Sequence, residues 1–305
     1  MRKEAKNRTP IEYNTIQGYH ERTEWGTNYA EQGFEGGFKF FASDRPIPAD
    51  AKNKGYGLEI EMTSQLNNAR ALAFVLDKGV FAHFPKGLFK MQHDGSLGGN
   101  TSAEVITQPM SKAFIRNHYN DFHAMYDFLH DFGTAPDNSC GMHTNISMSC
   151  FGSTREKQEA AIIRLHNWIS DNYNFACALF KRHPDYTGYC GRMRRIEELT
   201  PSGSHGTMCN YSHINEENAA RVELRLVGPQ KSFGSFRNTL EVVFHLVEAA
   251  KDGRDFSDPV KLWSGCNECV LDRLNDLVME GKMPVARYEA IAATAIDTGI
   301  RRATR

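Results

Sequence analysis

The feature that most constrains this chain is an alternation of apolar and polar residues in three stretches, at 56–62, 140–147 and 221–227. Because successive side chains of a β-strand point to opposite faces of a sheet, the alternation predicts strands with one apolar and one polar face. In the first stretch, Glu59 and Glu61 share the polar face. Such strands predict a sheet that buries one face and carries charged side chains on the other.

The polar faces of these strands carry groups that can bind metals. His143, Asn145 and Ser147 share a face of the second stretch, and Glu223 and Arg225 share a face of the third. Neighbouring carboxylates repel each other, and burying them without partners costs several kcal/mol. A divalent cation removes this penalty, so the three strands in one sheet predict a carboxylate-rich metal site with an arginine at its edge. Taken singly, each acidic or charged pair is more typical of a solvated strand face.

Turn residues and apolar spacing divide the rest of the chain into further elements. Strands and helices occur in mixed order, and the strands are amphipathic rather than continuously apolar. We therefore expect an α+β fold, with a mixed, largely antiparallel sheet, helices packed on one face and an open polar face that carries the site. The predicted strands cover 37–41, 56–63, 87–93, 101–107, 141–149, 208–214 and 220–227, and the predicted helices cover 67–78, 112–131, 155–180, 235–251, 258–281 and 285–299.

The 305 residues contain no internal repeat, low-complexity tract or clear linker. Residues 1–50 are polar with scattered aromatic side chains, which predicts an irregular N-terminal arm on the main body. We expect one main domain over 51–255 and a helical C-terminal extension over 256–305.

The charge and hydropathy of the chain indicate which classes of binding partner to expect. The formal net charge of −1 gives no general attraction to nucleic acid or to an anionic membrane. Without a run of 18 apolar residues or a signal-peptide pattern, the chain is expected to be cytoplasmic and to have no membrane partner. The basic cluster at 192–195 gives little support for nucleic-acid binding and predicts either a solvated patch or a position near an anionic nucleotide.

The seven cysteines are odd in number and mostly widely spaced, which is untypical of a secreted disulfide framework. Cys266 and Cys269 have the spacing of half a zinc site, but no second pair of ligands accompanies them. The pair is interpreted as reduced thiols, with a structural zinc site as the alternative.

Five short motifs follow one another along the chain, and they are Gly57-Leu58-Glu59-Ile60-Glu61, Asp94-Gly95-Ser96-Leu97, Ala103-Glu104-Val105-Ile106-Thr107-Gln108-Pro109, Cys140-Gly141-Met142-His143-Thr144-Asn145-Ile146-Ser147 and Val222-Glu223-Leu224-Arg225. Their order and spacing resemble those of the amidoligase family, carboxylate–amine ligases with a glutamine-synthetase-like fold that are frequent in bacteriophage genomes. The resemblance covers about residues 55–250.

The resemblance implies metal-binding roles for five side chains. Glu61 and Glu104 would hold a metal on the side of the acceptor substrate. Glu59, His143 and Glu223 would hold the metal that gathers the nucleotide phosphates.

The resemblance also implies residues that act on the substrates. Arg225 would face the transferred γ-phosphate of ATP, while Asp94 and Ser96 would position substrate or nucleotide from an Asp-Gly-Ser turn. Arg192 belongs to a loop similar to one in the family and is a further nucleotide-binding candidate. The general base stays open, with Glu104, Asp94 and the loop carboxylates at 197–198 as candidates.

Two positions depart from the family pattern. Many relatives have a second histidine where this chain has Asn145, and an amide is a poorer metal ligand, so Asn145 is not in the predicted ligand set. A second arginine of the wider superfamily is not identified by its motif. Its candidates are Arg182, Arg192, Arg194 and Arg195.

The implied activity is ATP-dependent formation of an amide bond through an acyl phosphate, with ATP and two Mg²⁺ (or Mn²⁺) ions as cofactors. Its substrates would be a carboxylate and an amine of an amino acid, a peptide or a protein side chain. Two alternatives stay open: another phosphoryl-transfer enzyme of the same fold, and a non-catalytic phage structural or binding protein.

Overall fold

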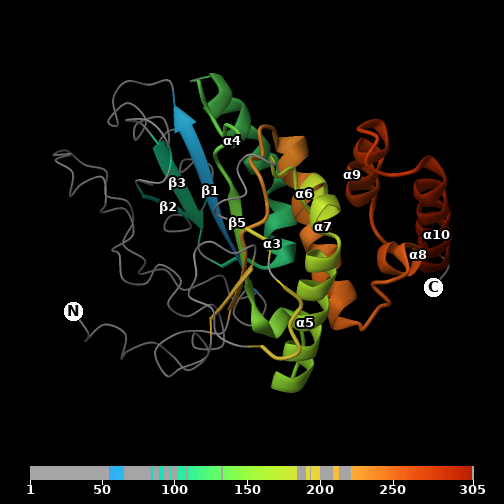
Figure 1. The fold of residues 1–305 in the computed structure, drawn as a ribbon. Helices are drawn as coiled ribbons and strands as arrows, with labels where there is room; N and C mark the ends of the chain where they lie inside the picture. Colours follow the sequence, from blue (N-terminus) through green and yellow to red (C-terminus); the bar gives the residue numbers. More distant parts are fainter. Residues whose placement is uncertain are drawn as a thin grey trace.

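The computed structural model describes residues 55–64, 84, 89–92, 97, 102–107, 109–131, 133–183, 190–192, 194–199, 209–212 and 221–303 (Figure 1). The predicted arm at 1–50, the predicted strand at 37–41, the predicted helix at 67–78 and the turn residues Asp94 and Ser96 lie outside these ranges.

One antiparallel sheet is the framework of the described chain. Six of its seven strands follow the order β2-β3-β1-β5-β7-β6, and the seventh, β4, pairs with β1 outside this path. Because every pairing is antiparallel, the predicted α+β fold with a largely antiparallel sheet is confirmed. The strands are β1 (Tyr56–Ser64), β2 (Phe89–Gln92), β3 (Ser102–Thr107), β4 (Thr134–Ala135), β5 (Met142–Ser147), β6 (Cys209–Ser212) and β7 (Arg221–Leu224).

The helices of the described chain lie on one side of the sheet (Figure 1). They are α3 (Lys112–Asn117), α4 (Tyr119–Asp131), the single 3₁₀ turn η5 (Met148–Cys150), α5 (Arg155–Asp171), α6 (Tyr173–Leu179), α7 (Phe233–Lys251), α8 (Pro259–Trp263), α9 (Glu268–Met279) and α10 (Val285–Ala303).

The apolar face of the sheet packs on these helices. Leu58 and Ile60 of β1 are buried, as their alternation with acidic residues predicts. Tyr56 meets Phe244 of α7 edge to face, with 4.6 Å between the ring centroids. Every residue of α7 from 239 to 247 is buried, which is typical of a helix enclosed on all sides. Helix α7 is therefore the centre of the helical layer.

Three predicted long helices are each divided in two, and a polar side chain or a glycine explains each break. His118 and Asn172 end α3 and α5, and each side chain bonds the carbonyl four residues earlier, at 2.8 and 3.0 Å. Between α8 and α9, Gly265 has a φ of 68°, and Asn267 caps the next helix by accepting the N–H three residues on, at 3.1 Å.

Helices α8, α9 and α10 occupy the predicted C-terminal extension, and α9 packs against α7. Leu274 and Leu277 of α9 belong to the same apolar core as the sheet residues. The division of the chain at residue 255 stays a prediction. No helix in the described ranges combines the length and the apolar character needed to cross a membrane.

One histidine in α7 predicts a pH dependence of stability. Burial lowers the pKa of His245 to about 4, and its Nε2–H donates to the Leu262 carbonyl at 2.9 Å. The unfolded chain, with an ordinary histidine pKa of about 6.5, binds this proton first as the pH falls. The contribution of neutral His245 to the free energy of unfolding is therefore complete above about pH 6.5. It is lost as the pH falls towards 4, and the loss is at most about 3 kcal/mol.

Urea unfolding between pH 7 and pH 4.5 checks this expectation. His245→Phe keeps a ring over Trp263, which the imidazole stacks on at 5.4 Å, but removes the titration. The variant should lose less stability than the parent over this range. Burial also lowers the pKa of His166, so part of the slope remains in both proteins. Equal slopes would contradict the role of His245.

Candidate metal centre

Two acidic groups on the polar face of the sheet share one histidine. Glu59, His143 and Glu223 form the first group, and Glu61, Glu104 and His143 form the second. Within each group, one ligand atom of each residue lies within 4.8 Å of the others. The register of the sheet produces both groups, because Glu59 pairs with His143 and Glu61 pairs with Glu104. The five predicted metal ligands therefore lie close together, although they come from four strands.

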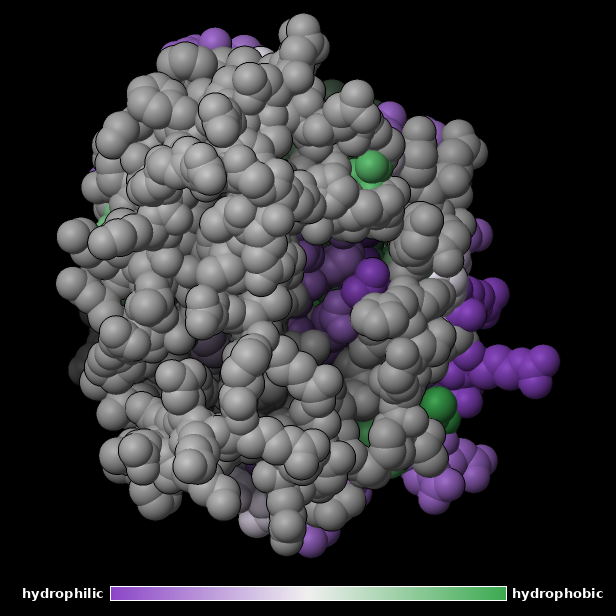
Figure 2. Space-filling model, turned by 90° about the vertical axis from the view of Figure 1, so that its left-hand side faces the viewer, coloured by the Kyte–Doolittle hydropathy of each residue, from purple (hydrophilic) through white to green (hydrophobic). Residues whose placement is uncertain are grey.

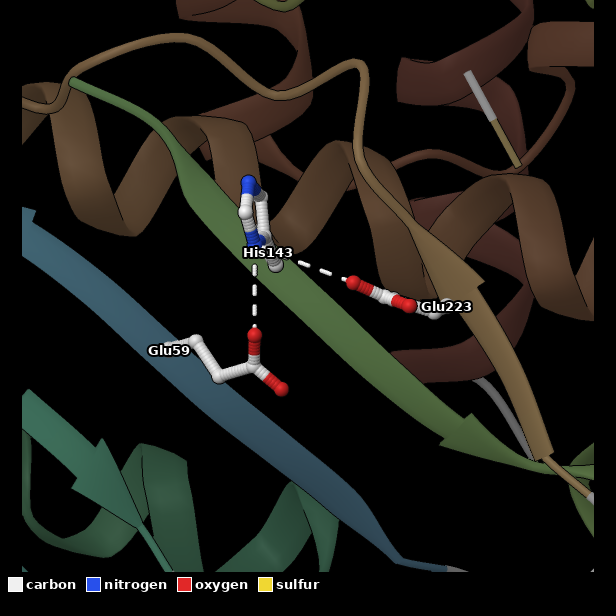
Figure 3. Close-up of side chains that lie close together, drawn as sticks. All are labelled: Glu59, His143 and Glu223. Atoms are coloured by element: carbon white, nitrogen blue, oxygen red, sulfur yellow. Dashed lines mark hydrogen bonds and ion pairs between the residues drawn. The ribbon is translucent and has the colours of Figure 1, made fainter. Parts of the chain in front are cut away.

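In the first group, the ring of His143 lies near two carboxylates, and all three side chains are on the same side of the sheet (Figure 3). Its Nδ1 is 3.2 Å from Oε2 of Glu59 and 3.7 Å from Oε1 of Glu223. Arg225 directly follows β7, and its Nη1 donates to Oε1 of Glu223 at 2.5 Å. Arg225 therefore adjoins the first group.

In the second group, the other nitrogen of the same ring faces Glu61. Nε2 of His143 is 3.4 Å from Oε1 of Glu61, and the backbone N–H of Gly141 donates to Oε2 at 2.5 Å. A Cβ at position 141 would lie 2.7 Å from Nη2 of Arg182 and 3.2 Å from Nε2 of His143. A glycine at this position therefore lets the main chain before β5 approach the Glu61 carboxylate.

Arg182, one of four arginines that the sequence offered as candidate site residues, holds the main chain beside the site. Its buried guanidinium donates to the carbonyls of Cys140, Arg225, Leu226 and Val227. These bonds tie the segment after β7 to the start of β5 and fix the backbone of Arg225. Sequence patterns carry no signal for such a role, because its partners are main-chain atoms.

The cluster is buried, which corrects the prediction that the polar face is open at this point. Exposed fractions are 6% for Glu59, 7% for Glu61, 5% for His143 and 6% for Glu223. These side chains face one another, and their mutual contacts reduce their accessible surface. On the side of the molecule away from the helices, Figure 2 shows hydrophilic residues near the centre of the face.

The acidic surroundings change the protonation of the shared histidine. Burial alone would lower the pKa of His143, but attraction to Glu61 and the hydrogen bond with Glu59 outweigh it, so the pKa is raised. The imidazolium form is favoured while it neutralises these carboxylates. A metal ligand must be a neutral imidazole, so metal binding at this ring releases a proton.

Asn145 belongs to this cluster, although it is not in the predicted ligand set. Its Nδ2 donates to Oε1 of Glu59 at 2.7 Å, and Glu223 lies directly opposite it in the sheet. Its Oδ1 is buried and has no hydrogen-bond partner among the described residues. A buried oxygen without a donor, beside carboxylates and an imidazole, fits a bound cation. The alternation itself was the signal, since Asn145 shares the face of His143.

The other predicted site residues differ in their placement. Glu104 is partly buried in the second group, whereas Asp94 and Ser96 lie outside the described residues. Arg192 is exposed, and within the described ranges no hydrogen bond or ion pair joins it to the acidic cluster. The predicted nucleotide contact of Arg192 stays a prediction.

The basic cluster around Arg192 reaches the helical layer at Arg195, which pairs with Asp171 of α5. Both line a cavity of about 640 Å³ between α5, α6 and the C-terminal helices. None of the clustered glutamates lines this cavity. The candidate site is therefore placed on the sheet, where the possible ligand atoms converge, and not at this cavity.

The half zinc motif has no further ligands in the described part of the chain. Neither Cys266 nor Cys269 belongs to a metal-ligand group there, and both thiols are free. Burial raises the pKa of Cys266 to about 11, which keeps this thiol protonated at neutral pH.

Comparison with protein-family models gives no match for this chain, and comparison with curated proteins gives none either.

Proposed function

We propose that the protein is an ATP-dependent carboxylate–amine ligase with a glutamine-synthetase-like fold. The observation that carries the proposal is the pair of acidic groups that share His143, with Arg225 hydrogen-bonded to one of them. The order of the five sequence motifs also supports a carboxylate–amine ligase. The proposed substrates are a carboxylate and an amine of an amino acid, a peptide or a protein side chain.

The charges of the cluster support binding of divalent cations. Four glutamates gather around one histidine and one arginine, so negative charge predominates when the carboxylates are ionised. Carboxylate oxygens with one imidazole suit hard cations such as Mg²⁺ or Mn²⁺. Glu59, His143 and Glu223 would hold one cation, and Glu61 with Glu104 would hold the other. Bound cations would neutralise the phosphates of ATP and polarise the transferred phosphoryl group.

The proposed reaction activates a carboxylate that does not condense with an amine in water. An oxygen of the substrate carboxylate attacks the γ-phosphorus of ATP, and the bond to ADP breaks, which leaves an acyl phosphate. The amine nitrogen then attacks the carbonyl carbon, loses a proton, and inorganic phosphate leaves. In this scheme Arg225 donates to the γ-phosphoryl oxygens and stabilises the charge that develops on them.

Calorimetric titration tests the nucleotide site. A non-hydrolysable ATP analogue is titrated into the protein with and without Mg²⁺, beside the variants Glu59→Ala/Glu61→Ala and Glu289→Ala. The Glu289→Ala variant removes an exposed carboxylate of α10 and is the control. We expect Mg²⁺-dependent binding in the parent and the control, and at least tenfold weaker binding in the double variant, because two ligand carboxylates are lost.

The same titration separates the alternatives. Absence of binding in the parent contradicts the proposal and favours a non-catalytic protein. Where binding occurs, phosphate release is measured with carboxylate–amine pairs. Release that needs both substrates supports a ligase, whereas transfer to a single acceptor indicates another phosphoryl-transfer enzyme.

A further inference from the structure

A buried amide lies within the first acidic group. Asn145 of β5 is 0% exposed, so every polar atom of its side chain must find its partner inside the protein. Its Nδ2 donates to Oε1 of Glu59 at 2.7 Å. In the sheet, Asn145 is paired with Glu223 of the adjacent strand β7. The side chains of the two residues are therefore neighbours on the same face.

The oxygen of this amide has no donor within the described residues. Leaving a buried carbonyl oxygen unpaired costs about 1–3 kcal/mol. Turning the amide over does not help, because Oδ1 would then face the Glu59 carboxylate, which only accepts hydrogen bonds. The neighbouring carboxylates cannot supply a hydrogen, so the group that would satisfy Oδ1 is a new donor or a cation.

We propose that Asn145 is part of the metal centre and acts through both ends of its amide. Nδ2 orients the Glu59 carboxylate, and Oδ1 is a fourth protein ligand of the cation held by Glu59, His143 and Glu223. This inference rests on the metal centre of the proposed function. The resulting set of three oxygen-bearing side chains and one imidazole is the kind that Mg²⁺ and Mn²⁺ bind.

The preceding residue of the strand supplies a matched control. Thr144 is also fully buried, and its Oγ1 also lacks a hydrogen-bond partner in the described part of the chain. Because successive residues of a strand face opposite ways, Thr144 points to the helical side of the sheet. Thr144→Val therefore removes a buried unpaired oxygen of the same strand without touching the acidic group.

Calorimetric titration of Mn²⁺ without nucleotide tests the inference in the parent, Asn145→Ala, Asn145→Asp and Thr144→Val. We expect Asn145→Ala to weaken one class of Mn²⁺ site about 10- to 100-fold, the usual effect of losing a group that holds a metal ligand. Asn145→Asp keeps an oxygen but loses the donor, so it should bind within a few-fold of the parent or more tightly. Thr144→Val should match the parent.

Each outcome has its own meaning. If Asn145→Ala binds Mn²⁺ like the parent, Asn145 has no part in the metal centre. If Asn145→Asp weakens binding as much as Asn145→Ala, the amide acts only through Nδ2, and Oδ1 is not a ligand. If the parent itself binds no Mn²⁺, the proposed metal centre fails, and this inference fails with it. Circular dichroism of the metal-free proteins separates these results from unfolding.

Discussion

Replacing Arg225 by alanine should lower ATP-dependent phosphate release about 10²- to 10³-fold, the usual loss when one donor to a developing charge is removed. The guanidinium is mostly buried, with 11% of the side chain exposed, and it donates to Glu223 of the first acidic group. In the proposed reaction it would lie beside the transferred phosphoryl group. The rate is measured with the carboxylate–amine pair that gives phosphate release in the parent.

Two companion variants make this result specific. Arg225→Lys keeps the charge but loses the planar fork of donors, so its rate should lie between those of the parent and the alanine variant. Arg237→Ala removes a half-exposed arginine of α7, outside the acidic cluster, and should leave the rate unchanged. A rate for Arg225→Ala within a few-fold of the parent, in a protein with a normal circular dichroism spectrum, would remove Arg225 from the mechanism.

Replacing Glu241 by alanine should destabilise the protein by about 1.5–3 kcal/mol, because it removes a buried carboxylate that accepts hydrogen bonds from three side chains. Burial alone would raise the pKa of this carboxyl, but bonds from Arg116, Tyr119 and Asn267 outweigh it and lower the pKa. Arg116 donates from Nε at 2.7 Å, Tyr119 at 2.8 Å and Asn267 at 2.7 Å. These contacts join α3, α4 and the start of α9 to α7.

Urea unfolding at neutral pH measures the loss. Glu248→Ala is the control on the same helix, since the Glu248 side chain is 46% exposed and pairs with Lys112 at the surface. Such a pair contributes about 0–1 kcal/mol. If Glu241→Ala loses no more stability than Glu248→Ala, the buried network does not stabilise the helical layer as described.

The alternation in the sequence identified the side chains that share a face because the period of two is a local property of a strand. Glu59 with Glu61, and His143 with Asn145, were grouped on this basis. The alternation does not predict the register between β1 and β5. Strands β2, β3 and β4 lie between them in the sequence, so the two strands pair only through the tertiary fold. Only the structure shows that Glu59 lies opposite His143 and Glu61 opposite Glu104.

Other features depend on contacts that no local pattern records. The helix breaks at His118 and Asn172 follow from side-chain bonds to the main chain, and both residues occur inside sequences with helical spacing. The two-residue strand β4 is too short to produce an alternation. Arg182 acts through carbonyls of two distant segments, so its role depends on the folded chain. The bond from Asn145 to Glu59 also joins two strands that are distant in the sequence, so no local pattern predicts it.

The alternation in β1 also protects the sheet against mispairing during folding. A slip of one residue would turn Glu59 and Glu61 towards the helical core and expose Leu58 and Ile60 on the polar face. Burying two carboxylates without partners among apolar side chains costs at least several kcal/mol, so the slipped register is strongly disfavoured. The charges that make these residues suited to cations therefore also select one alignment of the central strand, before any cation has bound.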